Sequence, residues 1–413
     1  MTSRRDYGAA ITGIGLVTGF GAGRAETWRA VRAGRSAVRR LDLDGLEVLG
    51  APTPPLPETS SGEPTIDLAL HAAREAVNDS GLSSGEFASA RAACTVSSSK
   101  GGMKSFLRLH RAFLEGQPPP ADFWELVSPS SPGTLVAREF AIRGPVVHYA
   151  AACATGVHAV IAGLQLIRSH EADLVLAGAT DASLVQPVVA AFERMGVLSR
   201  RLDDPERACR PFDRTRDGFA IGEGSAVLVL ESEARARARP GRAYVRVVAS
   251  AWGAEAYDLA RVSKARSSIG PLIRKALDAA RLSPARLDYV NAHGTGTVAN
   301  DPVECAAIRE ALGEHASHVW VSSLKPAVGH LLGAAGGVEL ALTVLAMHDG
   351  FLPPTLNLTD PDPECNVNHV PPGGLEREVN VAVKIAAGFG GHIGIVVLQR
   401  GDRITAPTAG SPG

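Results

Sequence analysis

Cys153 is the residue whose place in the sequence best suits covalent chemistry. It lies in the stretch AACATG (151–156), directly before the apolar, helix-like run VHAVIAGLQLI. The free N–H groups at a helix N-terminus favour a thiolate, the reactive form of cysteine. We therefore predict that Cys153 is a nucleophile, against the plainer interpretation of a small buried core residue. The plainer interpretation fits the other four cysteines better: Cys94, Cys209, Cys305 and Cys365.

Two histidines and one lysine have the types and positions to complete a site with Cys153. His293 lies in NAHGTGT (291–297), directly after a strand-like run, where α/β proteins place active sites. His330 ends KPAVGH (325–330), and Lys325 is one of six lysines beside 36 arginines. A lone histidine is usually structural, but two neutral imidazoles on one small site can donate hydrogen bonds to a developing thioester enolate.

The elements that must position these residues alternate along the chain. Strand-like runs alternate with helix-like runs such as 65–78, which indicates an α/β fold. The stretches around Cys153 and His330 each lead into a helix rich in small residues, and we expect these two helices to pack closely in a buried centre. The similarity of these two stretches predicts two related halves, residues 1–250 and 251–413. The strand-like runs are 9–14, 92–97, 145–150, 173–178, 224–231, 243–250, 287–291, 318–322 and 393–399.

The composition of the 413 residues fits a large folded protein and excludes several classes. Hydrophobic residues make up 45% and charged residues 21%, which argues against disordered and fibrous chains. The net charge of −1 provides no overall basic field, so we expect no nucleic-acid partner. The five cysteines are widely spaced and odd in number, which fits neither a disulfide framework nor a zinc cluster, and we expect no metal.

Two stretches raise the question of a signal peptide or a membrane span. The N-terminal stretch has an arginine pair before apolar residues, but its glycines suit a strand and a turn better than a signal. Residues 144–167 lack formal charges and are long enough to span a bilayer, yet they include Pro145 and two histidines. We expect a cytoplasmic protein with no membrane-spanning segment.

With these residues assembled, the chain resembles the elongating β-ketoacyl synthases, the condensing enzymes of fatty-acid and type II polyketide synthesis within the thiolase superfamily. The resemblance covers about residues 8–400 and rests on five motifs in order. These are ACATG around Cys153, PFDRTRDGFAIGEGSAVLVLE (211–231), NAHGTGT around His293, SSLKPAVGHLLGAAGGVE (322–339) and GFGG (388–391). It implies the five-layered α-β-α-β-α thiolase fold. It also implies an acyl carrier protein as partner, and a homodimer or a heterodimer with a related subunit.

The resemblance implies the chemistry of the three central residues. Cys153 takes an acyl chain from the carrier protein as a thioester. His293 and His330 assist the decarboxylation of a malonyl group and stabilise the enolate, which then attacks the acyl-Cys carbonyl. The implied reaction is a decarboxylative Claisen condensation that gives a β-ketoacyl product.

The resemblance also implies supporting roles. Lys325 holds a histidine and Glu304 in a charged network. The backbone N–H groups of the nucleophile and of Phe389 form an oxyanion hole, and the Phe389 ring is a gate. Thr295 and Thr297 hold the pantetheine arm. No cofactor of the enzyme's own is implied, because 4′-phosphopantetheine arrives on the carrier protein.

The chain departs from the family pattern at two places near the expected pocket. Asp258 stands in YDLA (257–260), where the family commonly reads Tyr-His-x-Thr, and His392 follows GFGG where Thr is common. We hypothesise that an acid and a base face one another there and favour a short or polar acyl group over a long saturated chain. The alternative is that both side chains point to solvent. Candidates for contact with an acidic carrier protein, or simply for a solvated loop, are Arg200, Arg201, Arg207 and Arg210.

Other functions fit parts of the pattern. A non-catalytic, chain-length-factor-like subunit keeps the fold but typically loses the cysteine that is intact here. An acyltransferase-like ketosynthase variant without elongation keeps that cysteine. A biosynthetic thiolase carries a second cysteine in a Gly-rich loop, whereas Cys365 lies in PDPECN. A Cys/His hydrolase needs neither two histidines nor a lysine.

Overall fold

A computed structural model describes residues 8–56, 61–239, 243–259 and 267–401. The N-terminal arginine pair and residue 260 of the YDLA motif lie outside these ranges. Within them, strands and helices alternate along the chain, which confirms the α/β prediction.

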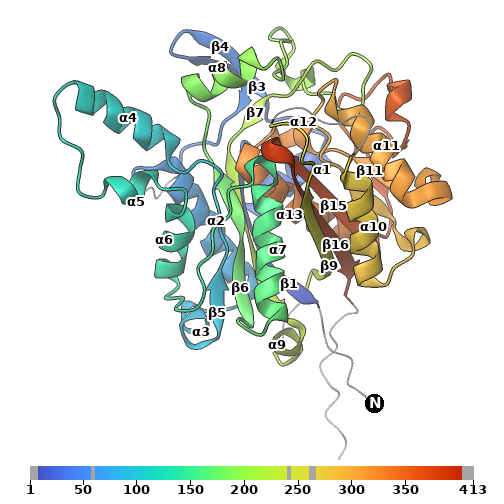
Figure 1. Cartoon of the computed structure of the whole chain (residues 1–413), viewed down its shortest axis with the longest axis horizontal. Helices are drawn as coiled ribbons and strands as arrows, with labels where there is room; N and C mark the ends of the chain where they lie inside the picture. Colours follow the sequence, from blue (N-terminus) through green and yellow to red (C-terminus); the bar gives the residue numbers. More distant parts are fainter. Residues whose placement is uncertain (1–7, 57–60, 240–242, 260–266, 402–413) are drawn as a thin grey trace, which may run out of the picture.

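One long sheet runs through the molecule (Figure 1). Its strands follow in the order β13 (Asn368–His369), β11 (Trp320–Ser322), β10 (Tyr289–Asn291), β15 (Val381–Gly388), β16 (His392–Arg400), β9 (Val245–Ala254), β1 (Ala9–Thr18), β8 (Gly224–Ser232), β6 (Leu174–Asp181) and β5 (Ala92–Cys94). The short strand β2 (Gly21–Ala22) pairs with β1. Two small sheets are made of β3 (Arg39–Leu43), β4 (Leu46–Ala51) and β7 (Ile221–Gly222), and of β12 (Phe351–Leu352) and β14 (Leu375–Glu376).

The order of strands repeats within the long sheet. In the first repeat β1 is antiparallel to β8, β8 is antiparallel to β6, and β6 is parallel to β5. In the second repeat β9, β16, β15 and β10 follow with the same relative directions. The repeats join where Ala9, Ala10 and Ile11 of β1 pair with β9. The second repeat therefore starts with β9, a few residues before the predicted boundary at residue 250.

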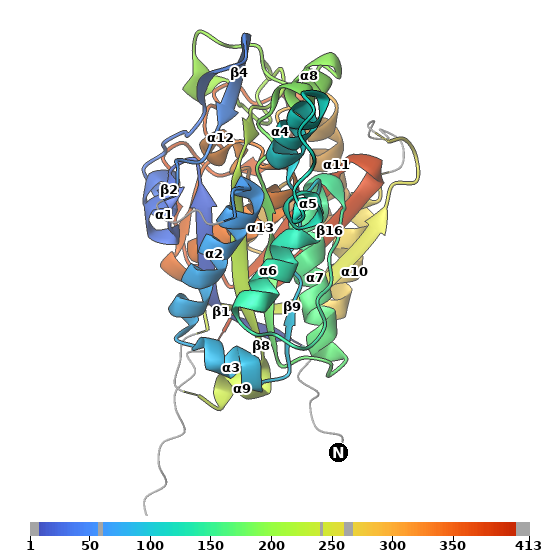
Figure 2. The ribbon, with the colours of Figure 1, turned by 90° about the vertical axis from the view of Figure 1, so that its left-hand side faces the viewer.

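Helices form three layers around the two halves of this sheet. The helices are α1 (Arg24–Arg32), α2 (Pro64–Ser80), α3 (Ser84–Ser89), α4 (Met103–Leu114), α5 (Phe123–Val127), α6 (Ser131–Glu139), α7 (Thr155–Arg168), α8 (Gln186–Arg194), α9 (Glu233–Arg237), α10 (Ile269–Ala280), α11 (Asn300–Leu312), α12 (Lys325–Val328) and α13 (Ala335–Asp349). Helix α2 covers β1 and β8 on the outside, and Figure 2 shows α2 and α6 over this face. Helices α10 and α11 pack together, and α10 covers β9 and β16. The layers are thus α-β-α-β-α.

Helices α7 and α13 form the middle layer between the two half-sheets (Figure 1). They cross where Gly156 meets Gly337, and a Cβ atom on Gly156 would lie 2.3 Å from the Gly337 nitrogen. Only glycine residues, which have no Cβ atom, permit so close an approach of two backbones. The predicted close packing of these two small-residue helices is confirmed.

Two local predictions need correction. Residues 145–150 form no strand: Val146 makes one isolated bridge to Cys94, because the segment has a single neighbour there and Pro145 has no N–H to donate. The predicted helix 65–78 is present as α2, but it begins at Pro64. Its N-cap is Glu63, whose carboxylate accepts from the Thr65 N–H.

In the described ranges, no helix has the length and apolar character needed to cross a membrane. Residues 144–167, considered above as a span, contain an extended segment, a turn and all but the last residue of the fourteen-residue helix α7.

Candidate active site

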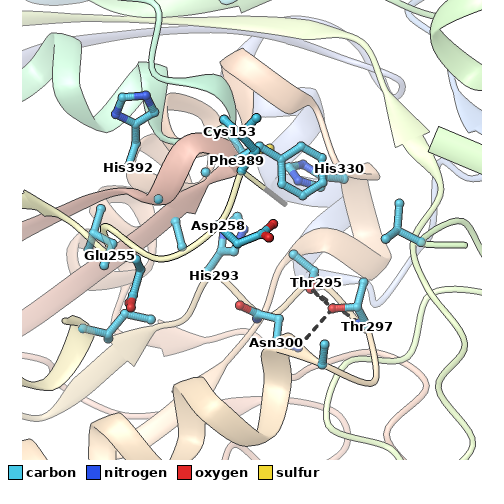
Figure 3. Close-up of a pocket in the computed structure, with 18 of the residues that line it drawn as sticks. Cys153, Glu255, Asp258, His293, Thr295, Thr297, Asn300, His330, Phe389 and His392 are labelled. Atoms are coloured by element: carbon cyan, nitrogen blue, oxygen red, sulfur yellow. Dashed lines mark hydrogen bonds between the residues drawn. The ribbon is translucent and has the colours of Figure 1, made fainter. Parts of the chain in front are cut away.

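A pocket lined by residues of both repeats brings together most of the predicted site (Figure 3). It encloses about 790 Å³ of empty space, open solvent at its mouth included. Two predicted residues, Lys325 and Glu304, are fully buried behind its wall. The predicted residues that line it are Cys153, His293, His330, Phe389, Thr295, Thr297, Asp258 and His392.

Cys153 lies in a 3₁₀ turn, η1 (Ala152–Ala154), that leads directly into α7. Ala152 has a φ of 46°, in the left-handed region that residues other than glycine rarely adopt. The Thr155 hydroxyl ties the turn together by donating to the Ala152 carbonyl and accepting from the Ala151 N–H. This geometry places the side chain of Cys153 on the pocket wall.

Burial of the Cys153 thiol works against the thiolate that a helix terminus favours. Burial raises its pKa to about 11, while the ammonium groups of Lys100 and Lys325 act in the opposite direction. A thiol has no full solvation shell in this position, so its anion is disfavoured. Any reaction in which Cys153 acts as a nucleophile therefore has to remove the thiol proton.

His293 follows β10, as the sequence predicts, and its surroundings fix its ring. The Glu304 carboxylate accepts from the backbone N–H groups of His293 (2.6 Å) and Gly294 (2.8 Å). The Lys325 ammonium donates to the His293 carbonyl and lies 3.4 Å from Nδ1 of the same residue. An ammonium can only donate, so Nδ1 accepts and the proton of a neutral His293 lies on Nε2.

His330 is fixed in the same tautomer by its own turn. The Leu332 N–H donates to Nδ1 of His330 at 3.2 Å, so its ring proton also lies on Nε2. The two rings stand edge to face with centroids 5.6 Å apart. Burial and the Lys325 charge hold the pKa of both histidines well below the ordinary value. Both rings are thus neutral and both carry an Nε2 proton beside the pocket.

The carboxylate in direct contact with Lys325 is Glu339, a residue for which the resemblance implied no role. Lys325 Nζ lies 2.7 Å from Glu339 Oε1, and both residues are buried. Glu304 accepts instead from backbone amides and from the Asn300 side chain. Glu339 lies one turn after the start of α13, and its side chain reaches Lys325 there. The spacing of the two residues along the chain does not reveal this contact.

Phe389 lies on the pocket wall in the turn that follows β15, and its ring stacks on Phe192 with centroids 5.9 Å apart. The residue before it, Gly388, packs on the Cys153 turn. A Cβ atom on Gly388 would lie 2.6 Å from the Ala151 carbonyl oxygen and 3.0 Å from the Cys153 nitrogen. The two backbone segments expected to form an oxyanion hole are therefore neighbours.

Thr295 and Thr297 form a second polar wall of the pocket. Their hydroxyl oxygens are 2.9 Å apart, and Thr297 Oγ1 also accepts from the Asn300 N–H at the start of α11. Figure 3 shows this hydrogen-bonded group together on one side of the pocket. It offers hydroxyl groups to a polar, extended ligand.

Asp258 and His392 both line the pocket. In Figure 3 the Asp258 carboxylate points away from the His392 ring. The His392 ring stands edge to face with His158 at 6.0 Å. Both residues thus lie at the pocket, where the sequence places them, and a direct pairing of acid and base stays a prediction.

Sequence reasoning missed two lysines next to the site. Lys384 is fully buried and bonds to Glu339 at 2.5 Å. Lys100 bonds to Asp181 at 2.9 Å, and its charge acts on both Cys153 and His330. The scarcity of lysine was the available signal, because it applied to these two lysines as much as to Lys325. In the described ranges no group of three or more His, Cys, Asp or Glu could hold a metal ion.

Models of the β-ketoacyl synthase family match two parts of the chain: the N-terminal domain matches residues 54–236 and the C-terminal domain residues 244–359. The tetracenomycin polyketide synthase ketoacyl synthase alpha subunit of Streptomyces glaucescens is 36% identical over 97% of this chain and 99% of its own length. The 3-oxoacyl-[acyl-carrier-protein] synthase 2 of Coxiella burnetii is 33% identical over 94% of this chain and 98% of its own length.

A solved structure of a related protein supports the same family. A type II polyketide synthase ketosynthase, solved in complex with its acyl-carrier protein and bound to the hexaketide, superposes with a TM-score of 0.89. It is 29% identical and covers 96% of this chain and 99% of its own. The duplicated five-layer architecture is the thiolase fold of the condensing enzymes. Within that class, the chain belongs to the β-ketoacyl synthase family, whose members are acyltransferases.

Proposed function

We propose that Cys153, His293 and His330 carry out a decarboxylative condensation between an acyl thioester and a malonyl group on an acyl carrier protein. The observation that carries this proposal is the shared tautomer of the two histidines, which leaves two Nε2–H donors beside one buried thiol. Two neutral donors on one small site match an enolate oxygen, the atom on which charge develops when a malonyl thioester loses carbon dioxide.

In the first half-reaction the Cys153 sulfur attacks the acyl thioester. A new bond forms between Cys153 Sγ and the acyl carbon, the bond to the carrier sulfur breaks, and the thiol proton passes to the carrier thiolate. The adjacent N–H groups of Cys153 and Phe389 would hold the carbonyl oxygen while it is negatively charged. Thr295 and Thr297 would hold the pantetheine arm through hydroxyl hydrogen bonds.

In the second half-reaction the malonyl carboxylate leaves as carbon dioxide and its electron pair forms the enolate. Nε2–H of His293 and of His330 donate to the enolate oxygen. The enolate carbon then bonds to the acyl carbon, and Cys153 leaves as a thiolate. A raised thiol pKa means that it takes up a proton from solvent readily. Lys325 holds His293 in position throughout, supported by Glu304 on the backbone side.

The carrier protein brings its own 4′-phosphopantetheine, so the proposed enzyme has no resident cofactor. Arg200 and Arg207 are exposed, and Arg201 and Arg210 are partly so. Together they would present positive charge to an acidic carrier.

Assembly as a homodimer, or as a heterodimer with a related subunit, belongs to this proposal. We also place the protein in the cytoplasm, in keeping with five free, buried cysteines.

We propose that the pocket prefers short or polar acyl groups, on the ground that two ionisable side chains, Asp258 and His392, line it. Acylation of Cys153 by hexadecanoyl, butanoyl and hydroxylated short-chain carriers tests this. Fastest acylation by the hexadecanoyl carrier, unchanged in a variant with Asp258→Ala and His392→Thr, would refute it.

The experiment that tests the function as a whole is incubation of the protein with an acyl carrier thioester and malonyl carrier protein. We expect the mass of one acyl group to be added to Cys153, followed by release of carbon dioxide and a β-ketoacyl carrier. Acylation without any condensation product would favour the acyltransferase-like variant. Neither acylation nor product would favour the partner-subunit alternative.

A further inference from the structure

Lys384 is a buried charge for which the proposed chemistry has no direct use. It lies in the middle of β15, fully buried, between the apolar residues Val383 and Ile385. Burying an ammonium group in such a strand is costly unless carboxylates and hydrogen-bond acceptors compensate it. Its neighbours therefore indicate what holds it there.

The Lys384 ammonium makes two hydrogen bonds, and both lead to His293. It donates to Glu339 Oε2 at 2.5 Å, and Glu339 Oε1 lies 2.7 Å from the Lys325 ammonium, which in turn contacts the His293 ring. It also donates, at 3.0 Å, to the carbonyl of Ala292, the residue directly before His293. Lys384 thus reaches His293 through a chain of charged side chains and through the peptide backbone.

The charges around Lys384 come from three other elements. Glu339 belongs to α13, Lys325 to α12 and Glu304 to α11, and the neutral His293 ring completes the group. With Glu304 ionised, the two lysines and two glutamates balance. Burial raises the pKa of Glu304, and the Lys384 charge opposes that rise. Without Lys384 the group would keep one uncompensated buried carboxylate.

We propose that Lys384 is a positioning residue of the condensation site: it holds Glu339 and the Ala292 carbonyl in place, so that Lys325 stays directed at Nδ1 of His293. This inference rests on the proposed function of His293 as an enolate donor. The pKa of Lys384 itself is lowered to about 8 by burial, so its charge is retained at neutral pH and lost in mildly alkaline solution.

The test replaces the ammonium by an apolar group of similar length, Lys384→Met. The matched control is Lys104→Met, because Lys104 also pairs with a buried carboxylate, Glu223, at 2.7 Å. NMR of histidine-labelled protein follows the titration of the His293 ring, and the same samples are assayed for Cys153 acylation and for carbon dioxide release across pH.

Loss of the Lys384 charge should raise the pKa of His293, by about one pH unit. The acid limb of the pH profile of carbon dioxide release should move to higher pH with it. Release at neutral pH should fall about tenfold, because Lys325 is no longer held against Nδ1 of His293. Cys153 acylation should stay within about twofold of the wild type, because the broken contacts lie on the histidine side. The Lys104→Met variant should match the wild type in all three measurements.

The conservative variant Lys384→Arg separates positioning from packing. Arginine keeps the charge and is larger, so a positioning role predicts a His293 titration nearer to wild type than in Lys384→Met, and a packing role predicts the reverse. If Lys384→Met does not fold, Lys384→Gln takes its place in the same measurements.

An unshifted His293 titration together with wild-type carbon dioxide release would overturn the inference. If the wild type releases no carbon dioxide, the proposed function fails, while the histidine titration still tests the position of Lys384.

Discussion

The turn that carries Cys153 and the turn at η5 (Leu332–Ala334) share a backbone geometry but differ in what surrounds them. Ala152 has a φ of 46° and Leu332 a φ of 49°, and each turn closes with a 3.0 Å hydrogen bond. Each then leads into a central helix, α7 or α13. The middle residue is Cys153 in one turn and Gly333 in the other.

The difference arises at the strand that ends beside each turn. Strand β15 ends at Gly388, which has no side chain and packs its backbone against the Cys153 turn. Strand β6 ends at Asp181, whose carboxylate accepts from the Gly333 N–H at 3.1 Å and from Lys100 and Ser99. One turn therefore opens onto a pocket and the other is filled by side chains. The same local conformation supports a reactive site only where the neighbouring strand leaves space.

The largest effect is expected from removing the thiol that distinguishes the two turns. Cys153→Ala should abolish acyl transfer to the protein, because no other residue of the pocket offers a thiol. Intact-protein mass after incubation with an acyl carrier measures this. The controls Cys209→Ala and Cys365→Ala, at buried positions outside the pocket, should acylate normally. Acyl mass on the Cys153→Ala protein would show that the nucleophile is another residue.

A second test separates the chemistry of the two repeats. His330, two residues before Leu332, belongs to the second repeat, and His330→Ala should slow carbon dioxide release from malonyl carrier by about 10²- to 10³-fold, the usual effect of losing one enolate or oxyanion donor. Acylation of Cys153 in the first repeat should continue. Wild-type release of carbon dioxide would remove His330 from the proposed mechanism.

A third test asks how full the second turn is. A Cβ atom on Gly333 would lie 2.7 Å from Cβ and Oγ of Ser99 and 3.0 Å from Asp181 Oδ2. Gly333→Ala should therefore lower the free energy of unfolding by about 1–3 kcal/mol, as overpacking of a buried site does. Cys153→Ala at the equivalent, open turn should cost about 1 kcal/mol or less. Chemical denaturation of both variants measures the difference, and equal costs would mean that the two turns are equally open.

The smallest effect concerns a charge that lies at the filled turn and acts on the open one. Lys100 lowers the pKa of Cys153, so Lys100→Met should raise that pKa further above 11 and reduce the thiolate fraction at any given pH. Alkylation of Cys153 by iodoacetamide between pH 7 and pH 9 should become a few-fold slower. A rate equal to that of the wild type would show that the Lys100 charge does not reach the thiol.

Much of the fold and part of the site follow from local sequence. The alternation of strand-like and helix-like runs predicts the α/β class, and the paired stretches before two small-residue helices predict the duplicated centre. On that basis, and on the repeated strand order, we propose that the chain arose from two related halves, with the second beginning at β9. The 145–150 segment shows the limit of such reasoning, because its residues favour a strand but the fold provides it with one neighbour and a proline.

Residue types and their spacing determined that Cys153 precedes a helix, that His293 ends a strand, and that both histidines lie in glycine-flanked turns. Only the tertiary structure decided the charges. Lys325 pairs with Glu339 rather than Glu304, and Lys384 completes that group from a strand whose pattern otherwise reads as apolar core. These contacts join residues 14 and 45 positions apart that lie in different elements, so local periodicity cannot report them. The raised pKa of Cys153 likewise depends on desolvation, which exists only once the helices and the two half-sheets have closed around the thiol.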